Sequence, residues 1–484
     1  MKDKPVLPAV WTDVFWSAVF IIAVTLGLVA MDPARMYHWF LIPVGACGAL
    51  IIPDAVRWLR RRYDTFDPKG IIGLQGVHFF FLAPLLYVLM DLEMPYVRNP
   101  LDWRPWLGYT ALLNFWGLLF YRFFADMWHC SGPLAKKWSF EPRRFWPALA
   151  IFVLIALVCQ AGFFSSVGGL EGFVEERTAR SGVIEGKGFL IMFGESFPVL
   201  LLFAVTCLHV KGRIKARPLV VIVVLIFFAV LQFFWAGLRG SRNTTIYAFF
   251  WAAGIIHYLW LKITPRQVLI GLIPFFIFMV VYGFFKDLGD RTLDLMKGAV
   301  TVAEMESEAP TRGAVNTIFL DLSRVDTQAY LVYKLFTDYP GRYRLALGRT
   351  YLGDVCILVP RSLWPDRPVK KEKEGTEILY GPGTYQPGSF ESTFVYGLLG
   401  ESLLNFHFAA VPFVFGLYGF FVAKIRHWIR GLPSGDARLL LAPFLVTIVV
   451  TALSHDLDNV VFNLVKSGLV PLLVVLLGTI KTSK

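Results

Sequence analysis

Two arginines in a short turn between apolar segments are the residues of this sequence best placed to do chemistry. Arg239 and Arg242 lie in the turn Gly237–Asn243. A guanidinium stays charged and can bind two phosphate oxygens through parallel hydrogen bonds. An unpaired charge is costly at the boundary of a hydrocarbon layer. We therefore interpret the pair as catalytic cations that hold an anion, with solvation by water or lipid headgroups as the simpler alternative.

Further arginines lie on the same predicted side of the membrane and are candidates for binding the same anion. For any one of them alone, an ordinary solvated arginine is the simpler interpretation. The candidates are Arg177, Arg180, Arg342, Arg349 and Arg361.

Glu401 is the acidic counterpart of these cations. It lies about two turns into the apolar segment 394–423. Removal from water raises the pKa of a carboxyl group, which makes Glu401 a candidate general base. A carboxylate hydrogen-bonded to a neighbouring helix is the alternative. Glu391 and Glu195 are candidates of the same kind, and Lys466 is expected to reach the outer interface with its long side chain.

Motifs for nucleotides, metals and cysteine chemistry are missing. The sequence has no glycine-rich phosphate loop, no HExxH and no CxxC, and none of its 8 His residues lies between 286 and 393. These motifs are the usual signatures of nucleotide-driven or zinc-dependent chemistry. We therefore expect neither a cofactor nor a metal.

The composition is that of an integral membrane protein. Of the 484 residues, 56% are hydrophobic and 16% aromatic, and only 17% are charged. A soluble chain this apolar would have too little interior for these side chains. The formal net charge is +12, but no nucleic-acid-binding motif accompanies it, so we expect no nucleic-acid partner. We expect anionic membrane lipids to attract this charge.

Twelve segments reach the roughly 20 mainly apolar residues that a membrane-spanning helix needs. This pattern predicts an all-α polytopic protein with about 12 transmembrane helices. The segments are 12–30, 37–53, 71–90, 105–125, 145–165, 189–209, 218–238, 244–261, 267–285, 394–423, 438–453 and 459–480.

Lys and Arg concentrate in alternate short loops, at 57–69, 136–144, 211–217 and 424–430. Because such loops stay in the cytoplasm, both termini are predicted to be cytoplasmic.

The chain then divides into helices 1–9 (1–285), one large outer loop (286–393) and helices 10–12 (394–484). Within the loop, apolar residues at helical spacing predict an amphipathic helix over 318–336, and 365–388 is predicted to be a mobile Pro- and Gly-rich loop. We interpret the loop as a lid.

Four short segments carry a resemblance to a known family. They are Gly168–Phe173, Gly240–Asn243, Pro360–Pro368 and Gly400–Phe406. Two loops also show an Arg-x10-Gly spacing, Arg177 to Gly188 and Arg342 to Gly353. With these features and its twelve-span plan with a large late outer loop, the chain resembles the O-antigen polymerase (Wzy-type) or oligosaccharide repeat-unit polymerase family of bacterial inner membranes, some members of which carry this spacing in the corresponding loops.

The resemblance implies an enzyme of the inner membrane that transfers a growing glycan from polyprenyl pyrophosphate onto an incoming lipid-linked repeat unit at the periplasmic face. Arginines would hold the pyrophosphate, Glu401 would accept a proton and Tyr385 would stack on a sugar. A chain-length-regulating copolymerase would be a possible partner. The family's Asn-Phe-Gly is Asn-Phe-His at 405–407 here, which predicts a different local backbone.

Two alternatives remain open. An O-antigen ligase shares the lipid-linked donor, but that family usually has a functional His in its large loop, which this loop lacks. A lipid-glycan transporter or flippase would need charged residues along a central pathway, for which Glu195, Glu401 and Lys466 are candidates.

Overall fold

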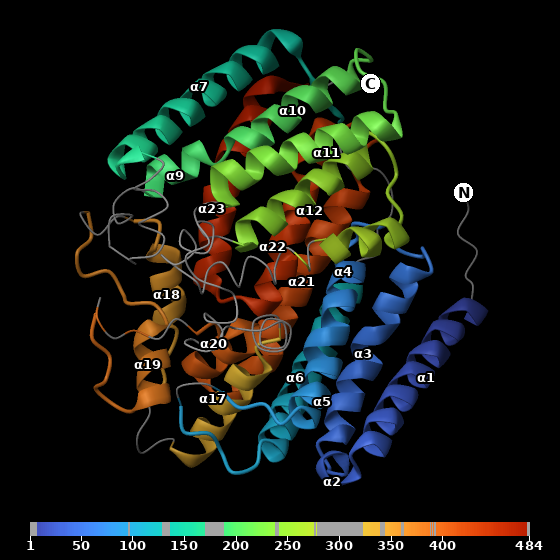
Figure 1. The fold of residues 1–484 in the computed structure, drawn as a ribbon, viewed down its shortest axis with the longest axis vertical. Coiled ribbons are helices and arrows are strands. Elements are labelled where there is room, and N and C mark those ends of the chain that lie inside the picture. Colours follow the sequence, from blue (N-terminus) through green and yellow to red (C-terminus); the bar gives the residue numbers. More distant parts are fainter. Residues whose placement is uncertain are drawn as a thin grey trace, which may run out of the picture. The chain divides into compact units, whose positions relative to one another are not determined.

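The structure is a computed structural model, and its ribbon is drawn in Figure 1. It describes residues 7–94, 97–127, 136–169, 188–237, 242–274, 323–338, 344–359, 363–387 and 394–481, with the single residues 277, 389 and 391. The side chains of 7–10, 237, 242 and 243 are outside this description. The chain forms two compact units. Unit 1 comprises Met1–His129, Ile318–His427 and Val449–Phe462, and unit 2 comprises Cys130–Thr317, Trp428–Ile448 and Asn463–Lys484.

The chain is an α-helical membrane protein. In the described ranges, eight helices are long and apolar enough to cross a membrane. Each overlaps a predicted span. They are Trp11–Met31, Leu41–Leu59, Pro68–Leu89, Pro142–Ser166, Gly188–Val210, Pro218–Ala236, Phe408–Arg430 and Leu457–Gly478.

The other four predicted spans stay predictions. Span 105–125 coincides with the 23-residue helix α6 (Arg104–Asp126), which is less apolar than the eight. Spans 244–261 and 438–453 correspond to shorter apolar helices, Thr244–Leu259 and Ala442–Ser454. Span 267–285 runs beyond the described residues.

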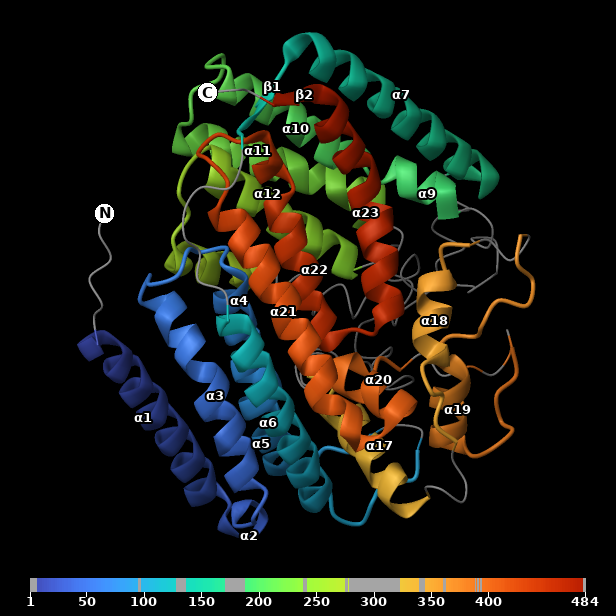
Figure 2. The same cartoon turned by 180° about the vertical axis from the view of Figure 1, so that it is seen from behind.

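Unit 1 is built around a hydrophobic core shared by helices from both ends of the sequence. Figure 2 shows its helices from behind. From the N-terminal part it takes α1 (Leu7–Met31), α2 (Pro33–Met36), α3 (Leu41–Leu59), α4 (Pro68–Gly76), a π-helical turn (Val77–Leu82), α5 (Ala83–Leu89) and α6. From the later part it takes α17 (Val325–Thr337), α18 (Arg349–Cys356), α19 (Glu372–Tyr380), α20 (Gly397–Phe406), a 3-10 turn (Phe408–Ala410) and most of α21 (Val411–Arg430).

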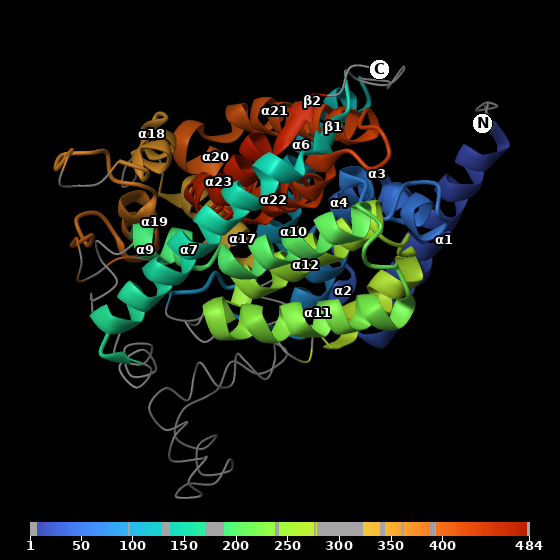
Figure 3. The same cartoon turned by 90° about the horizontal axis from the view of Figure 1, so that it is seen from above.

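Unit 2 holds the middle of the chain. It comprises α7 (Pro142–Ser166), α9 (Gly188–Gly194), α10 (Phe197–Val210), α11 (Pro218–Gln232), a π-helical turn (Phe233–Gly237), α12 (Arg242–Leu259) and a 3-10 turn (Ala437–Leu440). It also takes the larger parts of α22 (Ala442–Ser454) and α23 (Leu457–Gly478). The strands β1 (Trp138–Phe140) and β2 (Thr479–Lys481) pair antiparallel, with Ser139 opposite Ile480 (Figure 3).

Several helices begin at an acidic residue followed by proline. The carboxylate of Asp67 accepts the backbone N–H of Lys69 at 3.0 Å, and Pro68 is the first residue of α4. Glu141 and Pro142 start α7 in the same way. The carboxylate satisfies an N–H that the helix leaves free, and the proline ring presets the helical φ angle. The sequence therefore marks these helix starts locally.

Glycines let α6 and α21 approach closely. A Cβ at Gly117 of α6 would lie 2.6 Å from the Phe415 ring of α21, and Gly419 of α21 lies against the Tyr121 backbone. The rings of Tyr121 and Tyr418 stack beside this contact at 5.4 Å. Small residues are the usual means of close helix packing in membranes, where the hydrophobic effect between helices is absent.

The predicted tenth span, 394–423, is wrong in its boundaries. The helix breaks at His407, so α20 is a separate ten-residue helix and the long apolar helix begins only at Phe408. Glu401 therefore lies in a short helix that precedes the candidate span. The polar residues Glu401, Ser402, Asn405 and His407 precede or occupy the break, but the segment 394–423 is apolar enough as a whole to be predicted as one span.

The outer loop is more helical than predicted. The helix expected over 318–336 is α17, which begins at Val325 among the described residues. Both faces of its first two turns are buried, including Asp326, Thr327 and Gln328, and it packs against α5, α6 and α20. The segment 365–388, predicted to be a loop, contains α19. At the start of α19, Lys371 is only 4% exposed.

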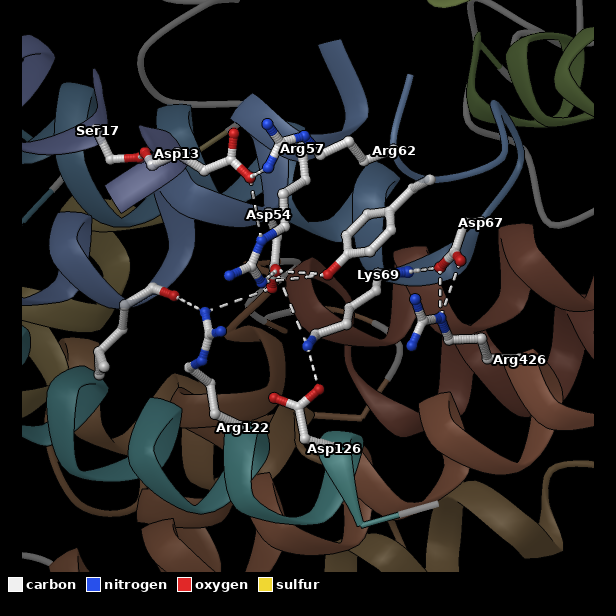
Figure 4. A network of polar contacts seen from close by, with 12 residues as sticks. Asp13, Ser17, Asp54, Arg57, Arg62, Asp67, Lys69, Arg122, Asp126 and Arg426 are labelled. Atoms are coloured by element: carbon white, nitrogen blue, oxygen red, sulfur yellow. Dashed lines mark hydrogen bonds and ion pairs between the residues drawn. The ribbon is translucent and has the colours of Figure 1, made fainter. Parts of the chain in front are cut away.

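A buried charge network joins five helices of unit 1 (Figure 4). Its centre is Asp54 of α3, a fully buried carboxylate. Asp54 accepts hydrogen bonds from Arg57 at 3.2 Å and from the Tyr63 hydroxyl at 3.1 Å. Arg122 of α6 lies 3.5 Å away, and Lys69 of α4 lies 3.8 Å away and also pairs with Asp126.

Two satellites extend this network. Asp13 of α1, also fully buried, pairs with Arg57, Arg60 and Arg62. Arg426 of α21 binds both oxygens of Asp67 at 2.9 Å. The network therefore ties α1, α3, α4, α6 and α21 to one another.

Replacing Asp54 with Ala is expected to cost about 3–5 kcal/mol, because it removes a buried carboxylate whose charge is shared by Arg57, Arg122 and Lys69. The measurement is reversible unfolding in mixed micelles. The matched control is Asp338→Ala, which breaks a 3.2 Å pair with Lys334 at the more exposed end of α17 and should cost about 1 kcal/mol or less. Equal losses in the two variants would show that Asp54 does not hold the unit together.

Candidate functional site

Glu401, the predicted base, is a buried carboxyl group of α20. Glu401 is only 3% exposed. Its Oε2 atom accepts a hydrogen bond from the backbone N–H of Leu457 at 2.8 Å. Burial raises the pKa of Glu401 above the ordinary glutamate value. A raised pKa gives the carboxylate greater affinity for a proton. The group therefore has the protonation behaviour that a general base at neutral pH requires.

Asp354 of α18 lies next to Glu401 and was not predicted. It is fully buried, and its carboxyl group is within hydrogen-bonding distance of Glu401. As two carboxylates, the groups would have only acceptors facing each other, and both Asp354 oxygens and Oε1 of Glu401 indeed lack a donor among the described residues. As an acid and a carboxylate, they share one proton. Burial and this hydrogen bond raise the pKa of Asp354.

Asn405 sets the register between the two helices. Its side chain accepts the N–H of Gly348 at 2.9 Å and donates to the Thr350 hydroxyl at 2.5 Å. Thr350 and Asp354 are four residues apart on α18, and Glu401 and Asn405 are four apart on α20, so each pair lies on one helical face. Since Asn405 meets Thr350 and Glu401 meets Asp354, α18 and α20 are antiparallel at this contact.

Two lysines at the start of α19 bring positive charge to the site. Lys371 forms an ion pair with Asp456 in the connection between α22 and α23. Burial lowers the pKa of Lys371. Lys370 pairs with Asp458 at 2.9 Å and with Glu372 at 2.7 Å. Asp456 in turn accepts the N–H groups of Tyr396 and Gly397 at 2.9 and 2.8 Å, at the start of α20.

The two lysines of the site are paired with other carboxyl groups. Lys370 pairs with Asp458 and Glu372, and Lys371 pairs with Asp456. In the described part of the chain, Asp354 and Glu401 therefore have no ammonium partner of their own. Desolvation penalises the charged form of such carboxyl groups and favours a proton on the pair.

The neighbouring His455 does not carry the proton. Burial and the nearby Arg324 guanidinium lower the pKa of His455 to about 4. The imidazole is therefore neutral at physiological pH. Tyr351 is also kept neutral, because burial and the two carboxyl groups raise the pKa of its hydroxyl.

Arg349 has a partner within the protein. It pairs with Glu374 of α19 and donates to the backbone oxygen of Val369. These contacts connect α18 to α19, and Figure 2 shows the two helices next to each other. Arg367 donates to the carbonyls of Cys356, Ile357 and Val359 at the end of α18. Both guanidinium groups therefore stabilise the position of α18, the helix that carries Asp354.

The other predicted arginines are only partly described. Arg177, Arg180, Arg239, Arg342 and Arg361 lie outside the described residues. Arg242 is the first residue of α12, and its side chain is outside the description.

Two further predicted residues meet each other. The Tyr385 hydroxyl donates to Oε1 of Glu391 at 3.3 Å, on a partly exposed loop of unit 1.

In unit 2, Lys466 does not reach the interface as expected. Its side chain is buried and lies 2.5 Å from Glu195, because an ion pair satisfies both charges away from water.

An apolar groove of about 420 Å³ lies in unit 2 between the end of α11 and α12. It is lined by Phe233 and Phe234 of the π-helical turn, by Thr245 and Phe249 of α12 and by Pro274. π-helical turns often occur at functional sites. The groove has the apolar lining that a hydrocarbon chain requires.

His407 holds a backbone conformation that favours glycine. Its φ and ψ angles are 61° and −162°, a region that residues with a Cβ rarely enter. His407 is therefore held in a strained backbone conformation, and the expectation of a backbone different from the family's at this position stays a prediction.

Comparison with known proteins adds no relative. No family model, curated protein or solved structure matches the chain. The chemistry of the site is therefore inferred from its residues.

The sequence signal for Asp354 was weak. It is a single acidic residue in the short segment Arg349–Cys356, and no motif surrounds it. Its spacing of four from Thr350, matched by the spacing of Glu401 and Asn405, becomes meaningful only when the two helices are known to be antiparallel neighbours.

The shared proton predicts that stability falls as pH rises. Because the folded pKa of Asp354 lies above its unfolded value, the stabilisation is complete below about pH 4 and is lost above it, with a slope of up to about 1.4 kcal/mol per pH unit. Asp354→Asn donates an N–H to Glu401 without binding a proton and should flatten this slope. Unfolding measured across pH tests this. The control Asp366→Asn removes an exposed carboxyl group and should keep the wild-type slope, and a wild-type slope in Asp354→Asn would contradict the shared proton.

Replacing His407 with Gly should stabilise the chain by about 1–3 kcal/mol, since glycine adopts this conformation without steric cost. The comparison is Phe406→Gly, which puts glycine inside the last turn of α20 and should destabilise by about 1 kcal/mol from the loss of helix propensity alone. Thermal unfolding of the two variants measures the difference. A lower melting temperature for His407→Gly would mean that contacts of the imidazole outweigh the backbone strain.

Proposed function

We propose that the chain is a membrane glycosyltransferase that polymerises polyprenyl-pyrophosphate-linked oligosaccharide repeat units at the periplasmic face of the bacterial inner membrane. The observation that carries this proposal is the buried carboxyl pair of Glu401 and Asp354. One half of the pair lies in a segment that resembles the family, and the pair has the raised proton affinity that the reaction requires.

In the proposed reaction, Glu401 accepts the proton of the sugar hydroxyl that attacks. The hydroxyl oxygen forms a bond to the anomeric carbon of the donor, the bond from that carbon to the pyrophosphate oxygen breaks, and polyprenyl pyrophosphate leaves. A pair that holds one proton keeps one carboxylate ionised and basic. Asp354 is therefore the positioning partner that tunes Glu401.

The leaving pyrophosphate needs cations, which we assign to Arg239 and Arg242. Arg177, Arg180, Arg342 and Arg361 are further candidates for this role. The groove lined by Phe233, Phe234 and Phe249 would take the prenyl chain, since its lining is apolar. Arg349 is not assigned to the pyrophosphate, because its guanidinium already pairs with Glu374.

A transporter is the second candidate. The observation that favours it is the buried ion pair of Lys466 and Glu195, which lie in two of the apolar helices. Ionisable residues inside membrane helices often form ion or proton pathways. These two charges neutralise each other, however, and Glu401 lies outside the apolar helices.

The glycan pattern of a deletion strain separates the functions. Loss of a polymerase leaves surface lipid capped with a single repeat unit. Loss of a ligase leaves the surface lipid uncapped, and loss of a flippase leaves the lipid-linked unit on the inner leaflet. A single-repeat cap is the expected result, and either of the other patterns would replace the proposal with the corresponding alternative.

In the same strain, Glu401→Gln should reduce chain extension by about 10²–10⁴-fold, because it removes the proton acceptor and keeps the shape of the side chain. Asp354→Asn should shift the pH dependence of extension to lower pH, since Glu401 then no longer competes for a shared proton. Gel analysis of glycan length, with protein amounts measured in parallel, gives both results.

The control is Glu377→Gln on α19, a partly buried carboxyl group outside the pair, which should extend chains as the wild type does. Normal extension in Glu401→Gln, at normal protein amounts, would assign Glu401 to structure.

A further inference from the structure

The helix α18 turns apolar side chains outward and polar side chains inward. Leu352 and Val355 of this helix are each 52% exposed, and Leu358, which follows it, is 42% exposed. Because the three residues are spaced by three positions, they continue along one side of the helix. The remaining side carries Thr350 and Asp354, which are fully buried. A helix at a surface that faces water is arranged in the opposite way, with its apolar side against the core.

Exposed apolar side chains on both flanks enlarge this surface. Leu347 precedes α18, and Leu363 and Trp364 follow it. The Arg367 side chain donates to carbonyl groups at the end of α18, and its backbone N–H donates to the carbonyl of Trp364 at 3.3 Å, so the segment after the helix folds back against it. An apolar surface of this kind marks a contact with a membrane or with another protein. We call it the outer face of α18, formed by Leu347, Leu352, Val355, Leu358, Leu363 and Trp364.

The outer face begins next to one of the long apolar helices. The N–H of Leu347 donates to the carbonyl of Asn405 at 3.0 Å, three residues before the apolar helix Phe408–Arg430 begins. The Phe406 side chain between them is also exposed, and a Cβ at Gly348 would lie 3.2 Å from its ring. The apolar surface is therefore continuous from α18 to the start of a helix that is long and apolar enough to cross a membrane.

The length and the packing of α18 determine how it can meet a membrane. It has eight residues, whereas a helix that crosses the hydrocarbon layer needs about 20. Its inward side is held by the hydrogen bond from Asn405 to Thr350 and by Gly353, where a Cβ would lie 2.9 Å from the backbone oxygen of Val369. The helix therefore keeps its outer face turned away from its neighbours in unit 1, and Figure 3 shows it at the edge of that unit.

We propose that the outer face of α18 inserts between the acyl chains of the adjacent membrane leaflet, so that α18 lies in the membrane interface. Interfacial helices bury an apolar side about 5–10 Å into the boundary between headgroups and acyl chains. Trp364 suits this position, because Trp is enriched at the boundary between hydrocarbon and water. A second protein could also cover an apolar surface, but the continuity with the long apolar helix favours lipid.

The membrane contact would set the height of the carboxyl pair above the hydrocarbon, and this consequence rests on the proposed function. Asp354 and Leu352 are two residues apart and therefore point to opposite sides of a helix that is about 10–12 Å wide with its side chains. The pair would lie at the level of the lipid headgroups, where the pyrophosphate of a lipid-linked substrate also lies. A fixed height contributes to the rate by orienting the reacting groups.

The test places the photo-crosslinker benzoylphenylalanine at single positions of the purified full chain, in nanodiscs of phosphatidylethanolamine and phosphatidylglycerol. In place of Val355 it should form phospholipid adducts, measured by mass spectrometry, as often as in place of Phe413, an exposed residue of α21. The control position is Lys373, an exposed residue of α19. Its yield should be about tenfold lower or less, because an exposed charged side chain marks a surface in water.

A lipid yield at position 355 no higher than at position 373 would overturn the proposal. Crosslinking of position 355 to a second copy of the chain in place of lipid would also overturn it and indicate a protein interface.

Val355→Asp tests the role of the contact in the reaction. A carboxylate is costly in hydrocarbon, so α18 should leave the interface and chain extension should fall about tenfold or more. The pH dependence of unfolding should stay that of the wild type, because the carboxyl pair is intact. Val355→Leu keeps the surface apolar and should extend chains normally.

Normal extension in Val355→Asp would overturn the positioning role of the contact. The crosslinking result is independent of the reaction. Lipid adducts at position 355 combined with normal chain extension in Glu401→Gln would therefore reject the proposed function and keep the membrane contact.

Discussion

A charge that leaves water must be matched inside the protein, and this constraint organises unit 1. Desolvation of an unpaired ion costs several kcal/mol, whereas a paired and hydrogen-bonded ion can be accommodated. Asp54 shows one solution, in which Arg57, Arg122, Lys69 and a tyrosine hydroxyl surround one carboxylate. Because these partners come from different helices, satisfying the charge also fixes the positions of the helices.

The same constraint produces a different result at the candidate site. Asp456 is satisfied by Lys371 and by two backbone N–H groups, and this arrangement fixes the start of α20. Among the described residues, Glu401 and Asp354 receive one backbone donor, from Leu457. A proton on the pair compensates for the missing cation. The Asp54 network and the carboxyl pair thus differ mainly in the number of cations that surround the carboxyl groups.

The fold class and most apolar helices could be predicted because hydrophobicity and length act locally. Eight predicted spans overlap helices that can cross a membrane. The boundary at His407 could not be predicted, because the polar residues Glu401, Asn405 and His407 do not show by themselves that His407 adopts a positive φ angle. Glu401 was recognised as an acidic residue in apolar surroundings. Asp354 and Lys371 were not, because their burial depends on contacts between segments more than 45 residues apart, as in Asn405 with Thr350.

The order of synthesis gives the ion pair of Asp67 and Arg426 a further consequence. The two residues are 359 positions apart, so at about 5–20 residues per second the ribosome needs roughly 20–70 s to supply the partner. Asp54 has Arg57, Lys69 and Arg122 within the first 129 residues and can be neutralised early. Asp67 meanwhile caps α4 by accepting the N–H of Lys69. The N-terminal helices can therefore insert into the membrane with Asp54 and Asp67 already hydrogen-bonded, before the C-terminal helices are synthesised.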